Sequence, residues 1–96
     1  MRLRERIAEL LSLPENGAGA PTIEAVETTL TDGYAAALAL DAERWRIERR
    51  LRDATDPAER ALLSERLETA RGQLSRLRSL LRSLHARARV MRRSAA

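Results

Sequence analysis

The chain has 96 residues, of which 44% are hydrophobic, and carries a formal net charge of +4. This length allows one small domain. The sequence contains no cysteine and a single histidine, which excludes disulfide frameworks, cysteine nucleophiles and a multi-histidine metal site within one chain. Sixteen leucines and seventeen alanines supply most of the apolar content, and this composition favours helices.

The charges are distributed unevenly along the chain. Residues 1–68 contain all fourteen acidic residues and ten arginines, whereas residues 69–96 contain eight arginines and no acidic residue. An acidic body followed by a basic tail makes nucleic acid, an anionic membrane surface or an acidic protein candidate partners.

A short amphipathic helix is predicted at the N-terminal end, over residues 1–13. Leu3, Ile7 and Leu10 recur in it at helical spacing, and Pro14 ends it because proline lacks a backbone N–H. The following residues 14–21 are rich in glycine and proline, which predicts a flexible linker.

Residues 22–96 are predicted to form a helical hairpin, with helices over about 22–53 and 57–93. The sequence Asp56-Pro57-Ala58-Glu59 supplies a capping carboxylate, a proline at the first helical position and a reciprocal glutamate. The linker between the two helices is about three residues long, and so short a linker makes consecutive helices antiparallel neighbours. The hairpin should be roughly 50 Å long at 1.5 Å per residue.

Both long helices carry seam residues at alternating spacings of three and four, which is the pattern of a coiled coil. The seam of the first long helix consists of Ile23, Val26, Leu30, Gly33, Ala37, Leu40, Arg44, Ile47 and Leu51. The seam of the second consists of Leu63, Leu67, Ala70, Leu74, Leu77, Leu81, Leu84, Ala88 and Met91. The sequence therefore predicts an all-α fold, a coiled-coil-like antiparallel hairpin with a short N-terminal helix, its core register defined to within one heptad.

Gly33 is the one glycine in these seams. We expect it to allow close packing against Leu74 or Leu81, in a continuous helix that bends near residues 31–33.

Charged residues beside the seams test the antiparallel arrangement independently. On one flank Arg50 should face Glu59, and Glu43 should face Arg66. On the other flank Glu27, Asp41 and Glu48 should face a row formed by Arg71, Arg78, His85 and Arg92, with His85 near Glu27. Each exposed ion pair contributes only about 0–1 kcal/mol, so this match supports the topology more than the stability.

One stretch of helix 22–53 is apolar nearly all round, which is typical of a helix covered on more than one side. Its candidate interface residues are Tyr34, Ala35, Leu38, Ala39, Ala42 and Trp45. Helix 1–13 spans only about 18 Å and should not reach Trp45. A two-helix hairpin also buries little apolar surface on its own. We therefore expect a homodimer that forms a four-helix bundle. A different helical protein could cover the same face instead. The simplest alternative is that the apolar stretch is a chance run of strong helix formers with no partner.

No residues assemble into a recognisable catalytic, cofactor or metal site. His85 has no nucleophile or orienting group that the pattern places beside it. Glutamate pairs at same-face spacing fall on flanks or solvent faces, whereas carboxylate metal sites in bundles need buried positions. Gly17 and Gly19 lack the strand and the lysine of a phosphate loop. We predict no enzymatic activity, no cofactor, no metal and no small-molecule substrate.

The basic end of helix 57–93 is the feature best suited to a specific activity. Arg82, Arg89 and Arg93 fall on its outward face and are expected to remain unpaired within the hairpin, which makes them the candidate anion or nucleic-acid contacts. Tyr34 and Trp45 lie on the other helix and do not interleave with these arginines, which disfavours binding of single strands.

The most favoured function is a non-catalytic interaction, scaffold or regulatory module that self-associates through helix faces. The alternative is an architectural nucleic-acid-binding protein that uses the arginine-rich third helix. The uncharged run 33–40 is far shorter than the roughly 20 apolar residues that span a bilayer. The N-terminal arginines loosely resemble a secretion signal, but Glu5 and Glu9 interrupt its apolar region, so we expect a cytoplasmic protein.

Overall fold

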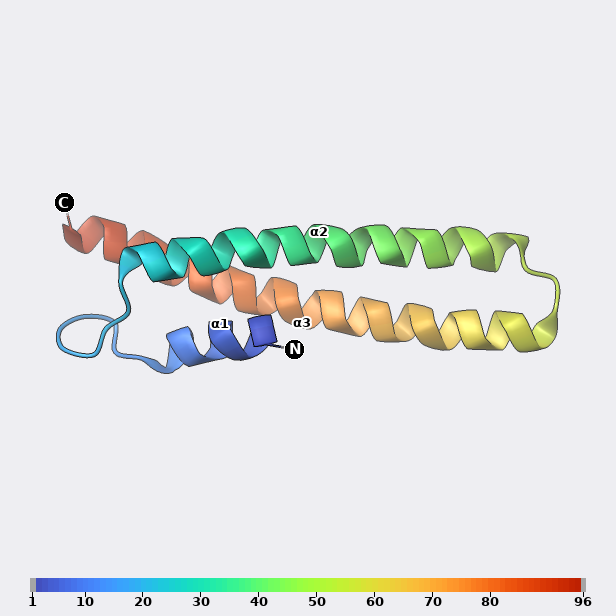
Figure 1. Ribbon diagram of the computed structural model, residues 1–96, viewed down its shortest axis with the longest axis horizontal. Helices are drawn as coiled ribbons and strands as arrows, with labels where there is room; N and C mark the ends of the chain where they lie inside the picture. The colour runs from blue at the N-terminus through green and yellow to red at the C-terminus, as the bar shows by residue number, and fades with distance from the viewer. Residues whose placement is uncertain (1, 96) are drawn as a thin grey trace.

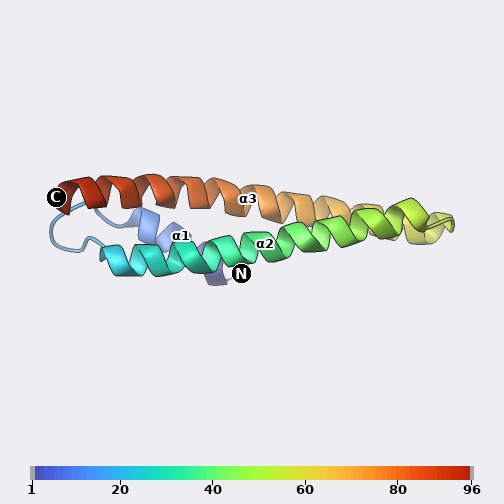
Figure 2. The ribbon, with the colours of Figure 1, turned by 90° about the horizontal axis from the view of Figure 1, so that it is seen from above.

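The computed structural model describes residues 2–95, which form three helices: α1 (Arg2–Ser12), α2 (Ile23–Asp53) and α3 (Pro57–Ala95). Helices α2 and α3 lie side by side and antiparallel, and α1 packs against the half of this hairpin that lies away from the turn (Figure 1). A view from above shows the same arrangement, with α1 beside both long helices (Figure 2). The molecule is a rod of 58 × 20 × 15 Å. The predicted all-helical hairpin is confirmed, and α3 extends two residues beyond its expected end.

The turn between α2 and α3 is capped from both sides. The Asp56 carboxylate accepts a hydrogen bond from the backbone N–H of Glu59 at 3.1 Å, which is the N-cap contact expected from the sequence. The Arg60 guanidinium donates to the backbone carbonyls of Leu51 and Ala54 at 2.7 and 2.8 Å. Leu51 lies in the last turn of α2, whose carbonyls lack partners within the helix, and Ala54 is its C-cap, so Arg60 closes the C-terminal end of α2.

The core is a line of side chains between α2 and α3. The buried residues of α3 follow the predicted seam and comprise Leu63, Leu67, Ala70, Leu74, Leu77, Leu81, Leu84 and Ala88. Those of α2 include Val26, Leu30, Gly33 and Ile47. Because the seam residues recur every three or four positions, each helix buries one narrow stripe and leaves its other faces exposed.

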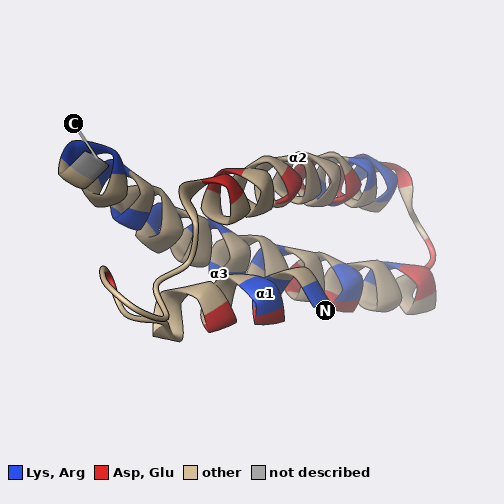
Figure 3. Cartoon of the chain, turned by 60° about the vertical axis from the view of Figure 1, so that its left-hand side comes forward, with Lys and Arg blue, Asp and Glu red and all other residues tan. Residues whose placement is uncertain are grey.

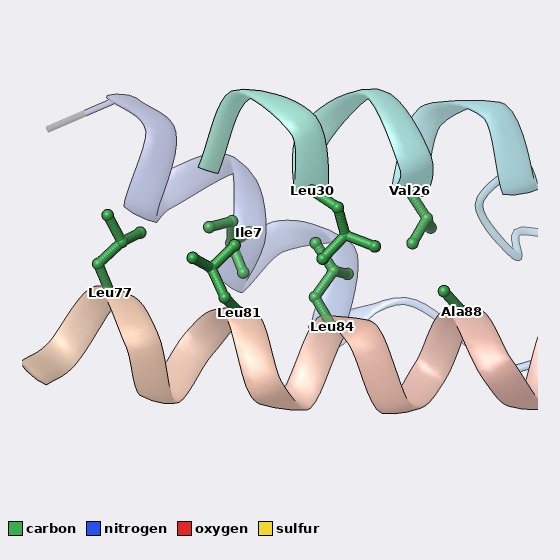
Figure 4. Close-up of a cluster of buried hydrophobic side chains, with 7 residues drawn as sticks. All are labelled: Ile7, Val26, Leu30, Leu77, Leu81, Leu84 and Ala88. Atoms are coloured by element: carbon green, nitrogen blue, oxygen red, sulfur yellow. The ribbon is translucent and has the colours of Figure 1, made fainter. Parts of the chain in front are cut away.

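At the open end of the hairpin, Ile7 of α1 joins this core. Leu77, Leu81 and Leu84 point from α3 toward Leu30 and Ile7 (Figure 4). Gly33 faces Leu81, one of its two expected neighbours, and α2 continues as one helix through this position.

Arg44 departs from the predicted seam. Its side chain is 29% exposed, and its guanidinium turns to the flank, where it donates to Asp41 at 2.8 Å and to Glu48. Burying a charge without a partner is costly, so the long arginine side chain leaves the core and keeps its charge among carboxylates.

The flank charges largely follow the antiparallel register. Glu27 pairs with Arg92 at 2.9 Å, Asp41 with Arg78 at 3.7 Å and Glu48 with Arg71 at 3.6 Å. These three cross-helix pairs define what we call the ion-pair flank.

On the opposite flank the match is incomplete. Arg50 lies 3.9 Å from Glu59, as predicted. Glu43 instead pairs with Arg46 one turn further along α2, at 2.8 Å, although Glu43 and Arg66 line the same hollow. A partner on the same helix costs less side-chain ordering than one across the hairpin.

His85 was expected to lie near Glu27, and this prediction was wrong. Glu27 binds Arg92, and within residues 2–95 His85 forms no ion pair. In the register that the three cross-helix pairs define, His85 lies opposite Tyr34, and tyrosine supplies no carboxylate for an ion pair.

Helix α1 is attached by polar contacts as well as by Ile7. The Arg87 guanidinium on α3 donates to three backbone carbonyls at the end of α1, those of Leu10, Leu11 and Leu13, at 3.2, 3.0 and 2.6 Å. Arg6 donates to Asp32 and Thr29 of α2 at 3.0 and 3.1 Å. These contacts place α1 on the flank opposite the ion-pair flank.

Within residues 2–95, no helix has the length and apolar character needed to cross a membrane.

Candidate interaction surfaces

The most exposed apolar side chains of the structure include a group on α2 that neither α1 nor α3 covers. Leu38 is 72% exposed, Trp45 53% and Tyr34 46%. Ala35, Ala39 and Ala42 are also exposed and lie between them. We call these six residues the outer α2 face. An exposed apolar patch of this kind on a small chain is typical of an interaction site.

The outer α2 face is uncovered because of the helical period. The core residues Val26, Leu30 and Ile47 occupy one side of α2, and residues such as Leu38 and Trp45 are rotated by more than a quarter turn from them. Helix α1 reaches α2 near Thr29 and Asp32, which is the other flank. Neither neighbouring helix therefore covers Leu38.

Trp45 carries a local cation contact. The Arg49 guanidinium lies over the Trp45 ring, 5.0 Å from its centroid. This i,i+4 pair holds the indole against the surface of α2 and keeps a positive charge beside the apolar patch. This pairing was not predicted, although the i,i+4 spacing of Trp45 and Arg49 in the sequence allows it.

The ion-pair flank contains a six-residue network that bridges the hairpin. It is formed by Asp41, Arg44 and Glu48 of α2 with Glu68, Arg71 and Arg78 of α3. Hydrogen bonds from Arg44 hold the pKa of Asp41 below its ordinary value, with a smaller contribution from the charge of Arg78. The same bonds to Asp41 and Glu48 raise the pKa of Arg44. These carboxylates are hydrogen-bond acceptors committed to arginines, which suits a structural role.

The arginines proposed for anion contact lie on the exposed surface of α3. Within residues 2–95, Arg82, Arg89 and Arg93 are exposed and form no ion pair. Figure 3 shows basic residues concentrated toward the C-terminal end of α3. Arg82 also lines an open hollow of about 330 Å³ together with Arg44, Arg71, Leu74, Ser75 and Arg78. Three of its four arginines are engaged with carboxylates, so Arg82 is the one with its charge free.

A second hollow lies between α1 and α3. It measures about 510 Å³ and is lined by Arg4, Glu5, Ala8, Arg76, Ser79 and Leu80. The walls are open to solvent and hold no histidine or paired carboxylates. In the part of the chain that the structure describes, no three His, Cys, Asp or Glu residues gather into a cluster suited to a metal ion.

Comparison of the chain with protein-family models, with curated proteins and with solved structures finds no match.

Proposed function

We propose that this protein is a non-catalytic helical interaction module that self-associates through the outer α2 face. The observation that carries the proposal is the exposure of Leu38, at 72%, next to the half-exposed rings of Tyr34 and Trp45. Burial of apolar surface contributes roughly 25 cal/mol per Å², so a partner that covers these three side chains gains a favourable contribution. The exposed alanines between them let a second helix approach closely.

The shape of the molecule supports a second copy as the partner. The hairpin is only 20 × 15 Å in cross-section and buries a single stripe of each long helix. Small helical domains of this kind gain stability by oligomerisation. Two hairpins joined through α2 would form a four-helix assembly in which the two outer α2 faces make a second core.

Sedimentation equilibrium tests this function. We expect the wild-type chain to sediment as a dimer and the variants Leu38→Glu and Trp45→Glu as monomers, because each buries a charge at the interface. The matched control is Leu62→Glu, which changes a leucine that is 49% exposed on α3, outside the outer α2 face, and should leave the dimer intact. Circular dichroism confirms that each variant is folded. A monomeric wild-type chain, or an unaltered dimer in Leu38→Glu, contradicts the proposal.

A second candidate function is binding of nucleic acid by α3. It is supported by the exposed Arg82, Arg89 and Arg93, which have no ion-pair partner within residues 2–95. Phosphate contacts release counterions, so such binding must weaken steeply as salt increases.

A duplex-binding assay across a salt series tests this candidate. Replacement of Arg82, Arg89 and Arg93 together by glutamine should lower the affinity and flatten the salt dependence. The triple change of Arg46, Arg50 and Arg66 to glutamine removes the same charge near the turn, outside both proposed contact surfaces, and serves as the control. Absence of binding by the wild-type chain at low salt, or an equal effect of both triple variants, excludes the candidate.

A further inference from the structure

Charge is segregated along α2. Residues 23–43 contain five acidic residues and no basic one, whereas residues 44–53 contain five arginines and two acidic residues. The first part of the helix is therefore negative and the last part is positive. Two α2 helices that pack side by side therefore repel each other where ends of like charge meet and attract each other where ends of opposite charge meet.

The outer side of α2 repeats this polarity along one line. Residues seven apart in a helix lie on the same face, and this face contains Glu24, Thr31, Leu38, Trp45 and Arg52. Leu38 is at the centre, 14 residues from Glu24 and 14 from Arg52. The line therefore has an acidic end, an apolar centre and a basic end.

The charges at the two ends of the line have no ion-pair partner within the hairpin. Glu24 and Arg52 are exposed and form no ion pair in the range 2–95. The other acidic residues near the start of α2 are engaged, Glu27 by Arg92 and Asp32 by Arg6. Free charges of opposite sign thus flank the exposed apolar side chains of the outer α2 face on both sides.

From this arrangement, and resting on the self-association proposed above, we infer the geometry of the partner. The outer α2 face receives the same face of a second copy in antiparallel orientation, with a two-fold axis near Leu38. Two-fold symmetry then brings Glu24 close to the partner's Arg52 and Arg52 close to the partner's Glu24. A parallel arrangement would instead place acidic end on acidic end and basic end on basic end.

The same geometry determines the shape of the assembly. Leu38 lies on the side of α2 away from the buried stripe that packs on α3. The two α2 helices are therefore central and the two α3 helices lie outside them, in a row of four helices. Helix α1 remains outside the interface, because it contacts α2 at Thr29 and Asp32 on the other flank.

Distance measurement between spin labels tests the orientation. The chain has no cysteine, so Ala25→Cys and Asp53→Cys each introduce one labelling site. Both residues are exposed, neither takes part in the proposed ion pairs, and they are 28 residues apart, which is about 42 Å along a helix. Sedimentation of each labelled variant establishes the association state before the distance is measured.

In the antiparallel dimer, Ala25→Cys alone should give a distance of about 40 Å between labels. A mixture of the two labelled variants should add a short distance, below about 25 Å, because adjacent helices are about 8–10 Å apart. A short distance in Ala25→Cys alone would indicate parallel α2 helices, which contradicts the antiparallel geometry but not self-association. A dimer whose mixture gives no short distance would associate through another face, which also contradicts this geometry. A monomer would contradict the proposed self-association as well.

Charge exchange supplies a test independent of labels. Glu24→Arg should weaken the dimer about two- to tenfold, because two exposed ion pairs become repulsive. The double variant Glu24→Arg with Arg52→Glu should regain the wild-type affinity. A double variant no tighter than Glu24→Arg contradicts the antiparallel pairing.

Discussion

Leu81 occupies the space that a Cβ atom on Gly33 would require. Both residues are buried, and Leu81 is packed among the core residues at the open end of the hairpin. Helices α2 and α3 thus approach each other closely at this level because residue 33 of α2 is a glycine and has no side chain. The glycine serves packing, as its backbone conformation is helical.

Replacement of Gly33 by alanine should lower the free energy of unfolding. The alanine gains about 1 kcal/mol in helix propensity, but overpacking against Leu81 costs roughly 1–3 kcal/mol. Gly72→Ala is the matched control, since a Cβ there meets only the mobile guanidinium of Arg76, at 3.6 Å. That control should be stabilising by about 0.5–1 kcal/mol. Chemical denaturation of both variants checks the difference, and equal stabilities would contradict the packing.

Arg87 should be essential for the attachment of α1. Its guanidinium donates to three carbonyls of residues 10–13, and hydrogen bonds to charged groups are worth roughly 1.5–3 kcal/mol. In Arg87→Ala, amide hydrogen exchange in residues 2–12 should accelerate by roughly tenfold or more, while α2 and α3 stay protected. The exposed neighbour Arg89, changed to alanine, should leave exchange in α1 unaltered. Undisturbed protection of α1 in Arg87→Ala would show that Ile7 alone holds the helix.

The ion-pair flank should make stability dependent on pH in the acidic range. Hydrogen bonds from Arg44 lower the pKa of Asp41 in the folded state, so its contribution is present above about pH 4 and is lost as the pH falls through the lowered pKa. Thermal unfolding between pH 7 and pH 2 should therefore show a smaller decrease in melting temperature for Asp41→Asn than for the wild type. Asp53→Asn, outside the network, should follow the wild type. Parallel curves for Asp41→Asn and wild type would count against this role.

The turn depends on the N-cap of α3. Asp56→Ala removes the acceptor of the Glu59 N–H and should cost about 1 kcal/mol of stability. Asp53→Ala, three residues earlier and without a hydrogen bond to the turn, should cost less. Chemical denaturation separates the two, and equal losses would mean that the cap contributes nothing specific.

The hairpin was predictable because its determinants are local. The alternating apolar spacing of α3 identifies every one of its buried core residues, and Asp56 with Pro57 specifies where the second helix begins. The cross-helix pairs Glu27–Arg92 and Glu48–Arg71 follow once the antiparallel register is known. Such features depend on helical period and on charge sign, both of which are present in the sequence.

The features that were not predicted depend on which of several possible partners a charged side chain takes, or on how α1 packs against the hairpin. Arg44 occupies a seam position, but its length lets the charge reach Asp41 and Glu48 on the flank. Glu43 takes Arg46 on its own helix in place of Arg66. The bonds from Arg87 to α1 join residues more than 70 positions apart, and no local signal indicates them. The function of the outer α2 face stays a prediction.

Emission from Trp45 tests self-association through this face most directly, because Trp45 is the only tryptophan and is 53% exposed in the single chain. Fluorescence is recorded for the wild type and for Leu38→Glu over a series of protein concentrations. Our account predicts a shift of the wild-type emission to shorter wavelength as concentration rises and the indole becomes buried, with Leu38→Glu unchanged throughout. A wild-type emission maximum that stays constant while sedimentation shows a dimer would place the interface elsewhere and contradict the account.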